Sequence, residues 1–148
     1  MESYLQDLEN SKKTHQMISS SRRNKQTGES ILNKAIEVII KDLYAFDANN
    51  IFRYPVDKKL APGYYDIVKH PVCMEEMSQR AKRQEYLTID SFQGDIVQMR
   101  CNAELFNGPH NEIAQLARNI EAKCFELSNS NEMQEQIQIA NSKIGIDF

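Results

Sequence analysis

The sequence predicts an all-α protein, a bundle of four helices, from two features of its residue pattern. Apolar residues recur at steps of three and four in four segments, and no segment alternates apolar and polar residues as a half-buried strand does. The 4 prolines of the 148 residues lie at 55, 62, 71 and 109, which leaves residues 1–45, 72–108 and 110–148 free to form long helices. Together these features indicate a bundle with an unusually long connection over residues 47–73.

The first helix is expected over residues 30–46. Thr27 or Ser30 is placed to cap its start, and Glu29 lies near the positive end of the helix dipole. The β-branched run at residues 38–40 would suit a strand by itself, but the periodicity on both sides favours a helix. The expected inner face consists of Leu32, Ala35, Ile36, Ile39, Leu43 and Phe46.

Three more helices follow the long connection. The second is expected over about residues 74–83, the third directly after Thr88 as its N-cap, and the fourth directly after Asn111. The inner faces expected for the second and third are Met74, Met77 and Ala81, and then Phe92, Ile96, Met99, Ala103 and Phe106. The inner face of the fourth is Ile113, Leu116, Ala117, Ile120, Cys124 and Leu127.

Composition divides the chain into three parts. Residues 1–29 read as a polar extension or linker, residues 30–128 as the helical domain, and residues 129–148 as a polar C-terminal extension. The C-terminal part is rich in Gln and Asn from Asn131 and is expected either to extend the fourth helix or to fray. The basic run Arg22, Arg23 and Lys25 fits a nuclear-import or nucleic-acid patch, although such a short run is more often a solvated linker.

The connection between the first two helices has 27 residues between Phe46 and Met74, where ordinary bundle loops have about 2–8. It is too apolar for a tether, because it carries Ile51, Phe52, Tyr54, Val56, Leu60, Tyr64, Tyr65, Ile67 and Val68. We expect this loop to fold back on the bundle. An aromatic, proline-braced loop over a helix bundle would form one wall of a pocket.

Charge and composition exclude several classes of protein. The net charge of −3 argues against DNA binding by phosphate neutralisation, which needs a dense basic surface. No apolar run approaches the roughly 18 residues of a membrane span, and the start of the chain does not resemble a signal peptide. The three widely spaced cysteines suggest no disulfide framework and fit a reducing cytosolic or nuclear setting.

The residues show no catalytic constellation. His70 and Cys73 are the nearest potential metal ligands, and the other histidines and cysteines are too scattered to complete the four ligands of a zinc site. The five glycines never cluster into a phosphate loop. We therefore predict no catalytic residue, no metal and no cofactor, and expect a binding module.

Four segments in this setting resemble the bromodomain family. They are residues 50–57 (NIFRYPVD), residues 61–71 (APGYYDIVKHP), Tyr86 with Phe92 and Asp95, and residues 102–107 (NAELFN). The resemblance covers about residues 30–128. It implies a left-handed four-helix bundle with a long loop between the first two helices, and recognition of acetylated lysine, usually on histone tails.

The resemblance also implies a role for particular residues. Asn107 matches the asparagine that hydrogen-bonds the acetyl carbonyl, and Tyr64 the tyrosine that reaches the same oxygen through a water. Ile113 matches the gatekeeper at the pocket mouth. The other residues placed at the pocket are Ile51 in the shelf, Phe52 and Val56 in the wall, Pro55, Leu60 at the entrance, and Phe106, where many members carry tyrosine.

The sequence departs from the family pattern at two places. Residues 50–52 (Asn-Ile-Phe) replace the Trp-Pro-Phe shelf of the BET subgroup, and Val72-Cys73 replaces the usual Met-Asp. The shelf looks more like that of bromodomains in chromatin-remodelling and acetyltransferase-complex scaffolds. The expectation is a non-BET type.

The expected function is a monomeric acetyl-lysine reader module in a nuclear, chromatin-associated protein. Its expected partners are acetylated histone tails and other subunits of a chromatin complex. Two alternatives stay open: a degenerate bromodomain that serves only as a protein–protein scaffold, and a nucleic-acid binder that uses residues 22–25. Asn107 also has a purely structural alternative, because asparagine is common as a helix C-cap.

Overall fold

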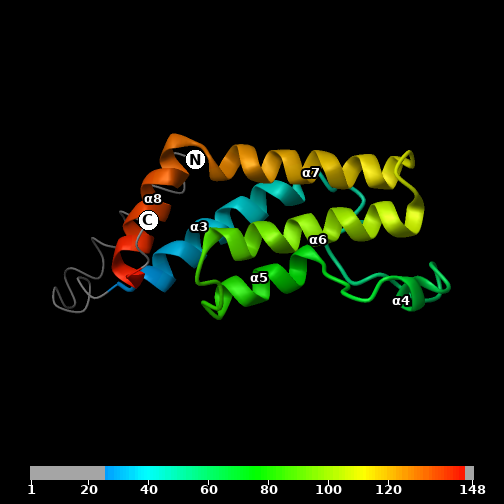
Figure 1. Cartoon of the computed structure of the whole chain (residues 1–148), viewed down its shortest axis with the longest axis horizontal. Helices are drawn as coiled ribbons and strands as arrows, with labels where there is room; N and C mark the ends of the chain where they lie inside the picture. The colour runs from blue at the N-terminus through cyan, green and yellow to red at the C-terminus, as the bar shows by residue number, and fades with distance from the viewer. Residues whose placement is uncertain (1–25, 146–148) are drawn as a thin grey trace.

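The computed structural model describes residues 26–145, and in this range every regular element is an α-helix, with no strand. The helices, labelled as in Figure 1, are α3 (Gly28–Tyr44), α4 (Tyr64–Ile67), α5 (Met74–Lys82), α6 (Ile89–Asn107), α7 (Glu112–Ser128) and α8 (Asn131–Ile144). Helices α3, α5, α6 and α7 are the four that the periodicity predicts, so the all-α bundle is confirmed. The basic run at residues 22–25 lies outside the described residues.

Side-chain caps fix where the helices begin. The Thr27 hydroxyl accepts a hydrogen bond from the Ser30 amide at 3.0 Å, so Thr27 rather than Ser30 is the N-cap of α3. The Asn111 side chain accepts from the Ile113 amide at 2.7 Å at the start of α7. Thr88 caps α6 in the same way as Thr27 caps α3. The predicted caps at 88 and 111 are therefore confirmed.

The predicted inner faces form one core, except at Phe46 and at Phe106, which is only half-buried and lies outside the core cluster. The fully buried side chains include Leu32, Ile36, Ile39, Leu43, Met74, Met77, Phe92, Ile96 and Ile120. Phe46, expected on the inner face, is instead 43% exposed, and the Lys123 ammonium lies 5.6 Å from its ring centroid. The prediction was wrong because α3 ends at Tyr44, so the helical spacing no longer applies two residues later.

Helix α8 corrects the expectation that residues after 128 extend the fourth helix or fray. Ser130 caps a new helix through the Met133 amide at 3.3 Å, and α8 packs against α3. Met133, Ile137 and Ala140 are buried. These three residues share one helical face, a periodicity that the surrounding Gln and Asn residues obscure in the sequence. The domain boundary after residue 128 stays a prediction.

The two ends of the bundle differ in what covers them (Figure 1). The loop of residues 45–73, which carries α4, and the short turn from α6 to α7 lie at one end. Helix α8 crosses the start of α3 at the other end. The loop end therefore brings together segments from residues 45–73, α6 and α7. Within the described range, the helices are all too short or too polar to cross a membrane.

Candidate functional site

A cavity of about 420 Å³ opens between the long loop and the ends of α6 and α7. Its lining is mostly apolar, which is typical of a small-molecule or side-chain pocket. All nine residues that the sequence places at the site line this one cavity: Ile51, Phe52, Pro55, Val56, Leu60, Tyr64, Phe106, Asn107 and Ile113. The structure therefore brings the predicted set together, whereas the role of each residue in binding stays a prediction.

The structure adds lining residues that the sequence did not assign to the site. These are Asn49, Tyr54, Asp57, Val72, Met99 and Ala103. Asn50 of the shelf and Ala61 beside Leu60 at the entrance belong to segments that the resemblance already places at the pocket, and they also line the cavity. Met99 and Ala103 precede Asn107 by eight and four residues on α6, so helical spacing places all three on one face. Helical spacing from Asn107 could therefore have predicted Met99 and Ala103 as lining residues. The added loop residues have no such periodicity and could not be predicted in this way.

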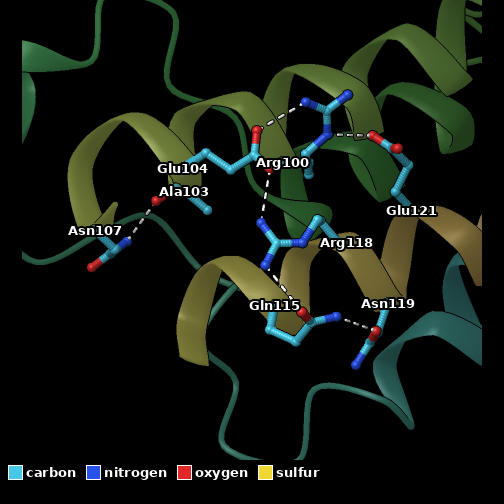
Figure 2. Close-up of polar contacts among 8 residues, drawn as sticks. All are labelled: Arg100, Ala103, Glu104, Asn107, Gln115, Arg118, Asn119 and Glu121. Atoms are coloured by element: carbon cyan, nitrogen blue, oxygen red, sulfur yellow. Dashed lines mark hydrogen bonds and ion pairs between the residues drawn. The ribbon is translucent and has the colours of Figure 1, made fainter. Parts of the chain in front are cut away.

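Asn107 is the last residue of α6 and lies on the cavity wall. Gly108 follows with a φ of +87°, a conformation that glycine adopts without strain, and its amide bonds to the Glu104 carbonyl at 2.9 Å. The Asn107 Nδ2 donates to the Ala103 carbonyl at 3.1 Å (Figure 2). An amide NH₂ group has two N–H donors, so one remains available for a ligand.

Tyr64 begins α4 and is 8% exposed. Its ring meets Phe106 edge-on, with the ring centroids 5.0 Å apart. Burial raises the pKa of the Tyr64 hydroxyl above its usual value, and the neighbouring Tyr65 adds to this shift. The hydroxyl is therefore neutral at physiological pH and can both donate and accept a hydrogen bond.

The start of the loop is fixed by a buried carboxylate that sequence reasoning missed. Asp47 is 1% exposed, and its two carboxylate oxygens accept from the amides of Ile51 and Phe52, each at 2.7 Å. On the other side, the Phe52 carbonyl accepts from the Met74 amide at 2.9 Å. The backbone at Phe52 is thus held from both sides, by the loop start and by the start of α5.

An ion-pair network joins α6 to α7 near the end of α6 that carries Asn107 (Figure 2). Glu104 accepts from Arg100 at 3.0 Å on its own helix and from Arg118 of α7 at 2.9 Å. Arg100 also reaches Glu121 of α7 at 2.9 Å. The hydrogen bonds from Arg118 and Arg100 lower the pKa of Glu104. This network holds the end of α6, which carries Asn107, against the first turns of α7.

The lining offers a neutral polar group rather than a reactive one. Asp57 is the only lining side chain that carries a charge, and its carboxylate accepts from the Lys59 amide at 2.8 Å. Cys73 lies outside the lining, and burial raises the pKa of its thiol to about 11. Among residues 26–145, no cluster of three His, Cys, Asp or Glu side chains could hold a metal ion. The site suits an apolar stem that ends in a hydrogen-bond acceptor.

Comparison with known proteins identifies a family and several relatives for this chain. The family model described as Bromodomain matches residues 36–119, more than half of the chain. Bromodomain-containing protein 9 of Xenopus laevis is 28% identical over 119 residues, which cover 80% of this chain and 22% of that protein. Transcription initiation factor TFIID subunit 1 of Oryza sativa subsp. japonica is 32% identical over 98 residues, 66% of this chain and 5% of that protein. The chain thus spans about a fifth or less of these relatives.

A solved structure shares the fold. The crystal structure of CpBRD2 from Cryptosporidium matches with a TM-score of 0.61 and 27% identity, over 65% of this chain and 90% of that one. This match confirms the left-handed four-helix bundle with a long loop between its first two helices. The family model covers more than half of the chain and the fold agrees with it, and we conclude that the chain belongs to the bromodomain family.

Proposed function

We propose that this chain is a reader module that binds acetyl-lysine, with acetylated histone tails as its ligands. One observation supports this most directly. Asn107 lies at the wall of a mostly apolar cavity with one amide N–H that has no partner among the described residues. An N–H donor at the wall of an apolar cavity suits a ligand side chain that carries a hydrogen-bond acceptor at the end of an aliphatic stem.

The same geometry discriminates against unmodified lysine. Acetylation turns the lysine ammonium into a neutral amide with a strong carbonyl acceptor. Bringing an unpaired ammonium into a low-dielectric site costs several kcal/mol, and the Asn107 N–H would point toward that positive charge. For the acetylated side chain, the hydrogen bond to Asn107 contributes about 0.5–1.5 kcal/mol, and leaving the buried amide unpaired costs roughly 1–3 kcal/mol.

Most of the affinity comes from apolar contact. Phe52, Val56 and Ile113 line the cavity and would cover the acetyl methyl and the aliphatic stem, at about 25 cal/mol per Å² of buried area. Tyr64 would reach the acetyl oxygen through a water. Ordering a flexible peptide opposes binding. We therefore expect micromolar affinity, with discrimination stronger than affinity.

The finer assignments belong to the same proposal. The Asn-Ile-Phe shelf at residues 50–52 favours a non-BET type, and all three residues line the cavity. The similarity to a transcription initiation factor supports a nuclear role in a chromatin or transcription complex. We further propose that the module acts as a monomer and performs no reaction of its own. The whole protein's partners are part of this proposal, because the relatives are much longer.

The test is a calorimetric titration of the chain with one histone-tail peptide in acetylated and unmodified forms. We expect micromolar binding of the acetylated form and at least tenfold weaker binding of the unmodified form. Asn107→Ala should abolish measurable binding while the chain stays folded. Equal affinities of wild type and Asn107→Ala would show that the proposed mechanism is wrong.

One contact favours the alternative of a scaffold without ligand. The Asn107 side chain donates to the Ala103 carbonyl of its own helix, a contact that would give it a structural role even without a ligand. If the acetylated and unmodified peptides both fail to bind the folded wild-type chain, the scaffold interpretation replaces the reader interpretation.

A further inference from the structure

We infer that Tyr65 is a positioning residue for the cavity: it holds Val56, which lines the cavity, although it does not line the cavity itself. This inference rests on the proposed function, since it concerns the affinity of the same site. It assigns to the second tyrosine of the Tyr64-Tyr65 pair a role different from that of the first.

The contact is short and partly buried. The Tyr65 hydroxyl donates to the Val56 carbonyl at 2.6 Å, across nine residues of the loop. The Tyr65 ring meets Tyr64 edge-on at 5.1 Å between centroids, and the Lys58 ammonium lies 5.5 Å from its centroid. The contacts of its ring therefore hold Tyr65 in place on α4, and the hydrogen bond from its hydroxyl holds the backbone of Val56 in the cavity wall.

Few polar contacts hold this part of the wall: besides the Tyr65 bond, the Arg53 guanidinium lies 5.4 Å from the centroid of the Tyr54 ring. The backbone of the loop is bonded at Arg53, whose carbonyl accepts from Glu75, and again at Asp57, whose carbonyl accepts from Leu60 and Ala61. Between them, Pro55 has no amide N–H to donate. Within the described part of the chain, the bond from Tyr65 is the only hydrogen bond that reaches the backbone of residues 54–56.

Loss of this bond should weaken binding without removing any contact to the ligand. A segment that is already in place when the ligand arrives does not have to be ordered at that moment, and this lowers the entropy cost of binding. Without the hydroxyl, residues 54–56 sample other positions, and Val56 must be ordered on binding. A single net hydrogen bond corresponds to an affinity change of about three- to tenfold.

Tyr65→Phe removes only the hydroxyl, and Tyr86→Phe is a matched control. The Tyr86 hydroxyl donates to Asp95 at 2.6 Å and is also partly buried, but Tyr86 lies outside the cavity lining. Both variants and wild type are titrated with a peptide that carries one acetyl-lysine flanked by glycines. We expect about three- to tenfold weaker binding for Tyr65→Phe and a change of less than about twofold for Tyr86→Phe.

Hydrogen exchange of the ligand-free chains separates failure of this inference from failure of the proposed function. The Leu60 and Ala61 amides, both bonded to Asp57, should exchange faster in Tyr65→Phe and at the wild-type rate in Tyr86→Phe. Unchanged exchange, or wild-type affinity of Tyr65→Phe, would overturn the role of Tyr65. If wild type does not bind the peptide at all, the reader function fails, and the exchange rates alone decide whether Tyr65 holds the wall.

Discussion

Asp47 shows how much of the loop depends on one side chain. A buried carboxylate is unfavourable unless its oxygens are hydrogen-bonded, and here two amides donate to it at 2.7 Å. The Asp47 carbonyl also accepts from Asn50, which has a φ of +56°. The first turn of the loop is therefore built around Asp47, and Phe52 takes its place in the core and the cavity wall as a consequence.

Asp47→Asn should destabilise the chain by about 1–3 kcal/mol. Asparagine keeps the shape, but its NH₂ group then faces one of the two backbone donors, and one buried amide loses its acceptor. The measurement is the free energy of unfolding in urea. Asp42→Asn is the control, because Asp42 is exposed on α3, and it should change stability by less than about 0.5 kcal/mol. A similar small effect of Asp47→Asn would contradict this role.

At this scale the sequence identified residues that line the cavity but not those that hold them in place. Asn107 and Tyr64 stand in motifs that can be matched residue by residue. Asp47 and Tyr65 act on backbone groups of a loop with no helical or strand periodicity. Their partners are determined by tertiary contacts, so spacing in the sequence does not reveal them.

At the scale of elements, periodicity and caps placed the four bundle helices to within a few residues. Helix α8 was missed because its buried face is narrow, with Met133, Ile137 and Ala140 set among Gln and Asn residues. Its contact with α3 is unusually close at Gly28, in the first turn of α3. A Cβ atom added at Gly28 would lie 2.5 Å from the Ala140 carbonyl oxygen and 2.6 Å from Ile144 Cγ1.

Gly28→Ala should therefore destabilise the chain by about 1–3 kcal/mol, because a backbone atom must move to admit the methyl group. Gly94→Ala provides the opposite case. Gly94 lies in the interior of α6, and outside its own helix turn no atom lies within 4 Å of an added Cβ, so the higher helix propensity of alanine should stabilise the chain by about 0.5–1 kcal/mol. Thermal unfolding of the two variants measures both, and effects of the same sign would refute the close packing of α3 on α8.

For the whole molecule, the structure makes α8 part of the same core as the bundle. Met133, Ile137 and Ala140 belong to one continuous buried cluster with residues of α3, α5, α6 and α7. The fold class and the long loop followed from the sequence. The extent of the folded unit did not, because it depends on contacts between α3 and α8, more than eighty residues apart in the chain. We propose that the unit reaches at least to the end of α8.

A chain that ends at Ser128 should accordingly be less stable than one that ends at Gly145. The truncation exposes the side of α3 that α8 covers and removes three buried side chains. We expect a midpoint of thermal unfolding lower by at least about 5 °C, since each kcal/mol shifts it by several degrees in a domain of this size. Equal midpoints would instead support the boundary after residue 128.

The position of α8 also decides how the module can be tethered. The Lys143 ammonium donates to the Gln26 carbonyl at 3.3 Å, so both ends of the described chain lie together, at the end of the bundle away from the cavity (Figure 1). An attachment made at Gln26 or at Gly145 would therefore lie at the end of the bundle opposite the cavity. The module can therefore be linked to other domains, or immobilised on a sensor surface, at either end of residues 26–145 while the cavity stays accessible.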